Sequence, residues 1–279
     1  MSKLRFVGER TLTLYVPLCV CTLFILFPIY WTLSTSLKRE TDIYTAPFKL
    51  LPSPATFSNF AFAWESVGFS TFFKNSIIVA SATVVCVLVI SLLSGYALSR
   101  FSFKGKAAFM ILLLCTQFIP AAMLIIPLFL IFKSMSLISS PLSLVITYTT
   151  IQLPFNTILM SGFIANVPIQ LEEAAMIDGC SRFKSILYVV LPVLMPGIIA
   201  VGAFTFIGAW NEFLFALMFI SNNAHFTIPV GLSFMQGEYK INYGASAAGS
   251  MIALLPTVLL FSYVQKYLVQ GMSAGAVKG

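Results

Sequence analysis

Residues 168–196 read PIQLEEAAMIDGCSRFKSILYVVLPVLMP. It gathers charged side chains in a chain that has few of them, and long apolar segments flank it on both sides; the charges are Glu172, Glu173, Asp178, Arg182 and Lys184. A single charge at the centre of a membrane span costs about 2.5–3.5 kcal/mol. We therefore expect this stretch to project into water between two membrane-spanning helices.

The order of residue types in this stretch indicates a helix, a turn and a second helix. Pro168 suits the start of a helix, and two glutamates in the first turn favour the positive end of the helix dipole. Gly179 is the residue type expected just beyond the end of that helix. Ser181 can cap a second helix that runs to Leu191, and Pro192 marks the end of that helix or a kink in it.

The composition is that of a membrane protein with several spans. Of the 279 residues, 59% are hydrophobic and 9% are charged, and the mean hydropathy is +0.96. A soluble domain has about 25% charged residues. The net charge of +7 would suggest nucleic acid as the partner of a soluble protein. Here the basic residues adjoin apolar segments, so we interpret them as determinants of membrane orientation and expect no nucleic acid partner.

Motifs for cofactors and catalysis are missing from the sequence. The five cysteines include no CxxC pair and His225 is the only histidine, so we expect no disulfide framework and no metal site. No GxxxxGK[ST] loop occurs, so we expect the chain to bind no ATP by that device and no other cofactor. The spans also lack a His, Cys or paired-acid constellation, and we expect the chain not to be an enzyme.

Six apolar segments are near or above the length of about 20 residues that a membrane-spanning helix needs; they are 12–33, 75–98, 107–132, 144–165, 193–220 and 246–269. Between them we expect external loops at 38–74, with a short helix at 58–67, and at 133–143 and 221–245. Several prolines should bend the spans: Pro120, Pro127, Pro154, Pro196 and Pro256. Gly95 in the second span is small enough to allow close helix packing.

The distribution of basic residues supports one orientation of these spans. Ten lysines and arginines fall in the segments expected inside: Lys3, Arg5, Arg10, Arg100, Lys104, Lys106, Arg182, Lys184, Lys266 and Lys278. The remaining six of the 16 fall outside: Lys38, Arg39, Lys49, Lys74, Lys133 and Lys240. Basic residues are enriched in short cytoplasmic loops, so we expect both termini to be cytoplasmic.

Polar side chains inside the spans are candidates for a solute pathway. They are Gln117, Gln152, Asn156, and the consecutive Trp210, Asn211 and Glu212. An aromatic face with amides and a carboxylate suits the C–H surfaces and hydroxyl groups of a sugar. The same residues can instead satisfy one another, or interrupted backbone, between packed helices.

The central stretch resembles the EAA loop of ATP-binding-cassette importer permeases. The matching residues are Glu173-Ala174-Ala175, then Gly179, then Val189-x-Leu191-Pro192, with valine where the family usually has isoleucine. GYALSRFSFKGK, residues 95–106, and the C-terminal MSAGAVKG, residues 272–279, are similar to segments of the maltose-type (oligosaccharide) carbohydrate permeases, and most so to the smaller of their two permease subunits.

This resemblance implies a fold and a set of partners. It implies an all-α bundle of six spans of the type I importer kind, forming one transmembrane domain over 1–279 with its core at 71–270 and its coupling loop at 168–192. The coupling loop would dock on a cytoplasmic ATPase through Glu172, Glu173, Ala174, Ala175, Asp178, Gly179, Arg182, Leu191 and Pro192. The implied partners are a second permease, two ATPase subunits that bind ATP and magnesium, and an external solute-binding protein, all at a bacterial inner membrane.

Two other transport functions stay open. An ion-gradient-driven transporter would use Glu212 as its coupling carboxylate, but it leaves the acidic helix without a purpose. An importer of glycerol phosphate esters would need a cationic residue well inside the spans, and the sequence offers none there, which favours a neutral sugar.

Overall fold

The computed structural model describes residues 11–44, 49–235 and 242–276. Their regular structure is helical throughout, which confirms the predicted all-α class, and no strand occurs in these ranges. Five helices in them are long and apolar enough to cross a membrane, or six if one sharply bent pair counts as a single span. The predicted number of spans is therefore reached only with that bent pair.

The chain divides into two compact units, 1–70 with 232–254 and 71–231 with 255–279. Helices α5 (Phe69–Arg100), α13 (Ile228–Phe234) and α14 (Tyr243–Ala276) have residues in both. The first unit otherwise holds η1 (Thr11–Tyr15), α2 (Val16–Ser36), α3 (Glu40–Ile43), α4 (Ser58–Ala61) and η2 (Phe62–Ser66). The second otherwise holds α6 (Lys106–Thr116), η3 (Ala121–Leu124), α7 (Ile125–Ser134), α8 (Pro141–Ala165), α9 (Ile169–Ile177), α10 (Arg182–Ser185), η4 (Ile186–Val190), α11 (Leu191–Trp210), α12 (Leu214–Phe219) and η5 (Asn223–His225).

In the first unit, polar contacts fix the end of α2 against the segment that follows it. Lys38 is buried; its ammonium group donates to the carbonyl of Lys49 at 2.6 Å and lies 4.7 Å from the centre of the Trp31 ring. Burial lowers the pKa of Lys38. The amide of Asn59 donates to the carbonyls of Ser36 and Lys38. The helix expected at 58–67 is confirmed by α4 and η2.

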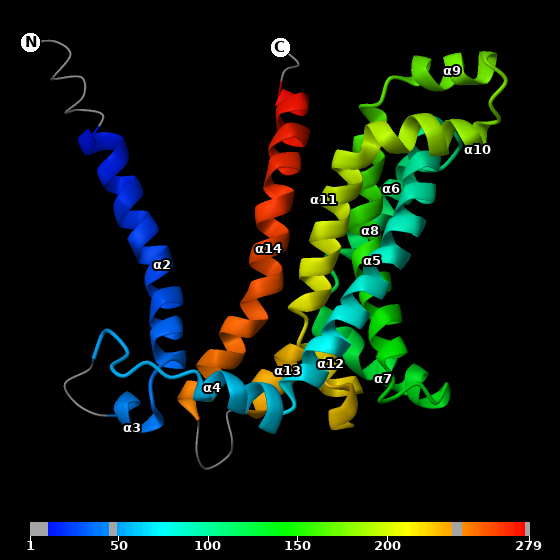
Figure 1. Cartoon of the computed structure of the whole chain (residues 1–279). Coiled ribbons are helices and arrows are strands. Elements are labelled where there is room, and N and C mark those ends of the chain that lie inside the picture. The colour runs from blue at the N-terminus through cyan, green and yellow to red at the C-terminus, as the bar shows by residue number, and fades with distance from the viewer. Residues whose placement is uncertain (1–10, 45–48, 236–241, 277–279) are drawn as a thin grey trace, which may run out of the picture. The chain divides into compact units, whose positions relative to one another are not determined.

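The core of the second unit lies between α5, α8 and α11 (Figure 1). Its buried cluster consists of Val87, Tyr96, Met160, Ile164, Val167, Leu194 and Val201. Two glycines let the helices approach closely. A Cβ atom on Gly95 would lie 3.0 Å from the backbone nitrogen of Ser161, and one on Gly197 would lie 2.6 Å from Cγ of Phe163. The close packing predicted at Gly95 is thereby confirmed.

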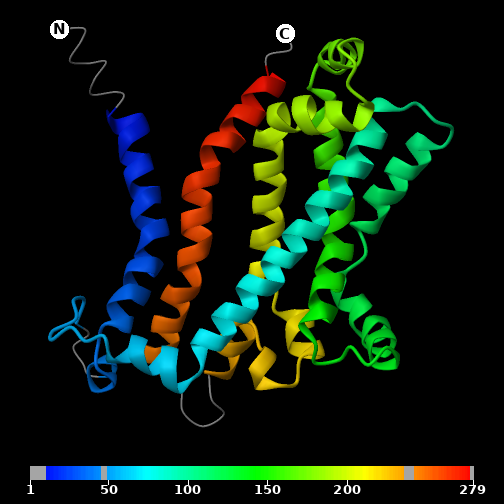
Figure 2. The ribbon, with the colours of Figure 1, turned by 45° about the vertical axis from the view of Figure 1, so that its right-hand side comes forward.

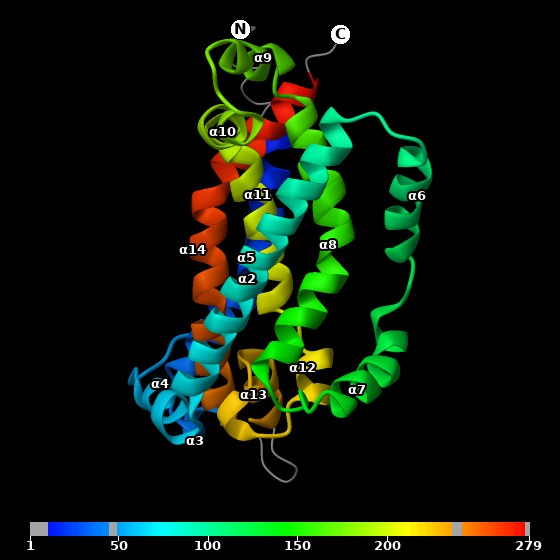
Figure 3. The ribbon, with the colours of Figure 1, turned by 90° about the vertical axis from the view of Figure 1, so that its right-hand side faces the viewer.

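Two of the predicted spans are broken. Residues 107–132 form α6 and the pair η3–α7, which meet at 92°; Figure 3 shows the irregular segment between them. Pro120, with ψ of 125°, stands at this break, as expected of a proline that cannot continue a helix. The prediction of one helix at 193–220 was wrong, since α11 ends at Trp210 and α12 starts at Leu214. Polar Asn211 and Glu212 lie in the gap.

Other boundaries also differ from the sequence-based ones. Helix α5 begins at Phe69, six positions before the predicted start, and α14 extends to Ala276 and so includes much of the predicted tail. The loop expected at 221–245 contains η5 and α13; its residues 236–241, with Glu238 and Lys240, lie outside the described residues, as do 1–10 and 277–279. The apolar length marks only the part of a helix that crosses the membrane, and it does not predict where the helix begins and ends beyond that part.

The coupling stretch forms two short helices at one end of the second unit. Figures 1 and 3 show α9 and α10 side by side, lying across the end of α11. Helix α10 continues through the π-helical η4 directly into α11. Figure 2 shows the chain bending between α10 and α11, and Pro192 occupies the first turn of α11. Of the two predicted alternatives at Pro192, an end of the helix or a kink in it, the structure has the kink. Because Pro192 has no N–H, it cannot bond to the turn before it, and a proline inside a continuous helix bends that helix.

Candidate functional site: the α9–α10 elbow and the break after α11

Local hydrogen bonds form the turn between α9 and α10, and they involve Gly179 and Ser181, the two residues predicted to end one helix and start the next. Gly179 has φ of +89°, and its N–H donates to the carbonyl of Met176 at 3.1 Å. The N–H of Cys180 donates to the carbonyl of Ala175 at 2.9 Å. This pair of bonds is a Schellman motif, which ends a helix on a left-handed glycine. The hydroxyl of Ser181 then accepts the N–H of Lys184 at the start of α10. Both predicted end residues are thus where the sequence placed them.

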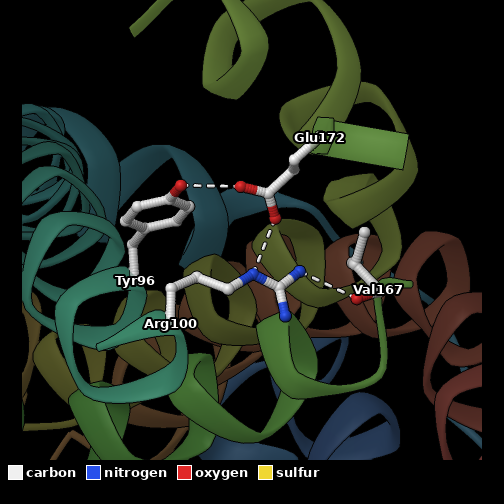
Figure 4. Close-up of polar contacts among 4 residues, drawn as sticks. All are labelled: Tyr96, Arg100, Val167 and Glu172. Atoms are coloured by element: carbon white, nitrogen blue, oxygen red, sulfur yellow. Dashed lines mark hydrogen bonds and ion pairs between the residues drawn. The ribbon is translucent and has the colours of Figure 1, made fainter. Parts of the chain in front are cut away.

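Glu172 points into the protein, not outward as an exposed docking residue would. It is 4% exposed. One carboxylate oxygen accepts the hydroxyl of Tyr96 at 2.6 Å and the other accepts Nε of Arg100 at 2.6 Å (Figure 4). Nη2 of Arg100 also donates to the carbonyl of Val167, at 2.8 Å. The expectation that both glutamates face an ATPase is therefore corrected for Glu172, which joins α9 to the end of α5.

Several side chains of α9, and that of Asp178 directly after it, are exposed to solvent. Glu173, Ala174 and Asp178 are exposed, and Ile177 is 86% exposed. Ala175 is buried on the opposite side. The exposed surface of α9 and the residue after it thus combines an apolar side chain, Ile177, with a small residue and two carboxylates.

Helix α10 rests on the turn that follows α5. The guanidinium carbon of Arg182 lies 5.1 Å from the centre of the Phe101 ring, a favourable position for a cation over an aromatic face. The ring of Phe101 in turn meets Tyr96 edge-on at 6.2 Å. Leu191 is partly buried and Pro192 is exposed. Arg182 is therefore engaged within the chain, while Pro192 remains on the surface.

The break after α11 is organised around Glu212. Its carboxylate accepts the hydroxyl of Tyr148 at 2.6 Å and the backbone N–H groups of Phe215 at 2.8 Å and Ala216 at 3.2 Å. A carboxylate in this position satisfies the free N–H groups of a helix start. Glu212 directly precedes Phe213, the N-cap residue of α12, and caps the helix with its side chain, which is a structural reason for an acid in an apolar segment.

The other pathway candidates do not converge on one cavity. Gln152 and Glu212 line a cavity of about 230 Å³, and Gln117 lines a second one of about 320 Å³; Ala121 and Ile151 line both. Asn156 is buried and donates to the carbonyl of Gln152.

The two residues that precede Glu212 are not among those that line these two cavities. Trp210 is 2% exposed, with its ring stacked on Phe206 at 5.5 Å and edge-on to Phe73 at 5.6 Å. Asn211 is exposed, and its amide donates to the carbonyl of Ile207 in its own helix. Trp210 is buried and its ring contacts the aromatic side chains of Phe206 and Phe73, a geometry that does not favour the predicted stacking of Trp210 on a sugar.

Two residues of the elbow were missed by sequence reasoning. Tyr96 and Arg100 lie one helical turn apart at the end of α5 and bind the same carboxylate. Arg100 was interpreted only as a topological charge. The available signal was its spacing from Tyr96, which places a hydroxyl and a guanidinium on one face of a helix end.

No group of three or more His, Cys, Asp or Glu residues that could hold a metal ion occurs in the ranges that the structure describes. The five cysteines are not paired with one another. The elbow and the break after α11 therefore offer hydrogen bonding, ion pairing and apolar contact as their chemistry.

Known proteins resemble the chain over most of its length. A family model described as binding-protein-dependent transport system inner membrane component matches residues 87–274. The chain is 36% identical to the sulfoquinovosyl glycerol transport system permease protein SmoH of Agrobacterium fabrum, over 91% of this chain and 89% of that protein. It is 37% identical to the diacetylchitobiose uptake system permease protein DasC of Streptomyces coelicolor, over 91% of this chain and 92% of that protein.

A solved structure shares the fold. A chain in the crystal structure of a bacterial ABC transporter involved in the import of the acidic polysaccharide alginate superposes with a TM-score of 0.82 and 23% identity, over 94% of this chain and 96% of that one. This likeness confirms the predicted helical membrane fold.

Proposed function

Because the chain belongs to the family of binding-protein-dependent transport system inner membrane components, we propose that it is a permease subunit of an ATP-driven carbohydrate importer and forms half of the membrane pathway. Its partners would be a second permease, two ATPase subunits that carry ATP and magnesium, and an external solute-binding protein. This chain itself would bind no cofactor and hydrolyse nothing. It would reside in a bacterial inner membrane with both termini in the cytoplasm.

The proposal of a carbohydrate solute rests on relatives and on the cavities. The two sequence relatives are named for uptake of a sulfoquinovosyl glycerol and of diacetylchitobiose. Among the described residues, those lining the two cavities include two glutamines, two threonines, a tyrosine and Glu212 but no lysine or arginine. Hydroxyl, amide and carboxylate groups on a wall that is apolar elsewhere suit the hydroxyl groups and C–H surfaces of sugar units. A glycerol phosphate ester would lack a cationic partner on this wall.

The observation that carries the coupling role is the surface of α9. Glu173, Ala174 and Ile177 of this helix, and Asp178 after it, are exposed to solvent. The buried Glu172 of the same helix binds Tyr96 and Arg100 of α5. In the mechanism we propose, closure of the two ATPase subunits on ATP displaces α9, and the spans attached to it tilt so that the pathway opens outward. Hydrolysis reverses the movement.

Purification of the complex tests this function. The chain, tagged and isolated in mild detergent from its own cells, should retain an ATP-hydrolysing subunit, and Ile177→Asp should reduce that retention at least tenfold. Asn223→Asp is the matched control, because Asn223 is also exposed but adjoins Ala224, which binds Asn75 near the start of α5, whereas α9 is attached to the other end of α5. Uptake of labelled di- and trisaccharides should persist with a protonophore present. A chain that purifies without any ATPase, or whose uptake stops with the protonophore, would contradict the proposal.

A further inference from the structure

The second unit contains a buried ion pair that docking on an ATPase does not require. Nε of Arg100 and Oε1 of Glu172 are 2.6 Å apart, and their side chains are 9% and 5% exposed. Burying two charges costs solvation free energy, so a pair of this kind is weak evidence for a stabilising role. It is better explained as a device that fixes one geometry between two elements, here α9 and α5.

The geometry of the cluster restricts both position and rotation. The two oxygens of Glu172 are bound by Tyr96 and Arg100, which stand at successive turns of α5. A carboxylate held at both oxygens by charge-assisted bonds has a fixed orientation. Arg100 also binds the carbonyl of Val167, one of the three residues between α8 and α9. Both the connection that leads into α9 and the first turn of α9 are thus attached to α5, a helix that does not adjoin them in the chain.

The same end of α5 also supports α10. Phe101, the residue after Arg100, carries the guanidinium of Arg182 on its ring and contacts Tyr96 with its edge. Both helices of the coupling stretch therefore rest on α5 in addition to their covalent neighbours α8 and α11. A force on α9 reaches α5 directly.

The opposite end of α5 is attached to the segment 224–228. The amide of Asn75 donates to the carbonyls of Ala224 at 2.9 Å and Phe226 at 3.0 Å, and the hydroxyl of Ser76 accepts the N–H of Ile228 at 2.8 Å. From Asn75 to Arg100 a helix spans about 38 Å. One helix thus has polar attachments to the docking helix at one end and to a loop at the other.

We propose that Tyr96, Arg100 and Glu172 are positioning residues that connect α9 to α5, so that α5 transmits the displacement of the docking helix to the segment 224–228 at its far end. This inference rests on the proposed ATPase docking at α9 and adds the route by which the movement crosses the membrane. Removing the ion pair should leave ATPase retention intact, but the displacement of α9 should then no longer reach the segment 224–228.

Hydrogen–deuterium exchange on the tagged importer complex tests the route without a known solute. The readout is the change in deuterium uptake of residues 224–228 between the nucleotide-free complex and the complex trapped with ATP and vanadate. Glu172→Gln and Tyr96→Phe should each cut this change at least twofold, while the ATPase copurifies in wild-type amount. Lys104→Gln is the control, since it removes an exposed charge four positions beyond Arg100 and should keep the full change.

The possible outcomes distinguish a failure of the proposed route from a failure of the proposed function. A full-sized change in both variants would overturn the route, and so would a wild-type complex that holds its ATPase but shows no change at 224–228. Loss of the ATPase from both variants would mean that the cluster only keeps α9 folded, which also overturns it. A wild-type chain that retains no ATPase would instead refute the proposed function, before any variant is made.

Discussion

Glu212 shows at the level of one residue how an acid is accommodated in an apolar segment. Its carboxylate accepts three hydrogen bonds, from Tyr148 and from two backbone N–H groups of α12. We expect Glu212→Gln to lower the free energy of unfolding by about 1.5–3 kcal/mol, because hydrogen bonds to a charged group are stronger and a glutamine offers one accepting oxygen. The midpoint of thermal unfolding, followed by tryptophan fluorescence in detergent, measures the change.

The neighbouring residue provides the control for this prediction. Asn211 is exposed and its amide donates to a carbonyl of its own helix, so Asn211→Ala should change the midpoint little. An unchanged midpoint for Glu212→Gln would show that the carboxylate is not a structural cap and would revive its use as an ion-coupling group.

The structural role of a residue could be predicted from the sequence where its hydrogen-bond partners are nearby in the chain, but not where they are distant. Gly179 and Ser181 bond within four residues, and both were placed correctly. Glu172 and Glu212 bind tyrosines 76 and 64 positions away in the chain. No pattern around either glutamate distinguishes a buried carboxylate from an exposed one, because burial is decided by which distant helix packs against it.

At the scale of the element, the turn between α9 and α10 depends on one backbone conformation. A non-glycine residue in the left-handed region costs about 1–2 kcal/mol, and a Cβ atom on Gly179 would meet no neighbour within 4 Å. We therefore expect Gly179→Ala to disturb only the turn, and to lower the initial rate of carbohydrate uptake about fivefold or more while the chain still inserts. Uptake assays and membrane immunoblots measure the two effects.

Gly105 is a control matched in conformation. It has the same φ of +89° and equally open surroundings, but it lies in the turn between α5 and α6. Gly105→Ala should carry the same backbone cost and leave uptake near the wild-type rate. Equal losses in both variants would mean that uptake responds to general strain and not to the coupling turn.

Contact between α8 and α11 depends on a glycine of a different kind. A Cβ atom on Gly197 would lie 2.6 Å from the Phe163 ring, so Gly197→Ala should destabilise the second unit by about 1–3 kcal/mol through overpacking. Gly162→Ala is the counterpart, with no atom within 4 Å of its Cβ, and should be neutral or stabilising by up to about 1 kcal/mol. Thermal unfolding in detergent compares them, and similar midpoints for the two variants would contradict the close approach.

Whole spans were predicted well where apolar length alone decides, and less well where polar residues and prolines interrupt. The segments that became α2, α5, α8 and α14 are uninterrupted helices. Pro120 correctly predicted a bend in the third span, but the angle of 92° between its two helices depends on packing that cannot be derived from the sequence. The break after Trp210 was read as a polar site within one helix, since Glu212 can act either as a lining group or as a cap.

The orientation of the molecule in the membrane is the remaining large-scale prediction. In the second unit, the basic turn at 100–106 and the α9–α10 elbow lie at one end, joined by Arg100 and Glu172. The segment from Asn222 to His225 lies at the other end. The basic turn and the elbow carry Arg100, Lys104, Lys106, Arg182 and Lys184, and basic residues are enriched in short cytoplasmic loops, which predicts that this end faces the cytoplasm.

Cysteine accessibility in intact cells tests this orientation. In a background with the five native cysteines replaced by serine, Lys104→Cys should react with a membrane-impermeant maleimide only after the cells are opened. Asn223→Cys should react in intact cells at once, because both side chains are exposed and only the membrane distinguishes them. Labelling of position 104 in intact cells would place the α9–α10 elbow outside the cytoplasm, where it could not contact a cytoplasmic ATPase. The proposed coupling through Glu172 and α5 would then be refuted as well.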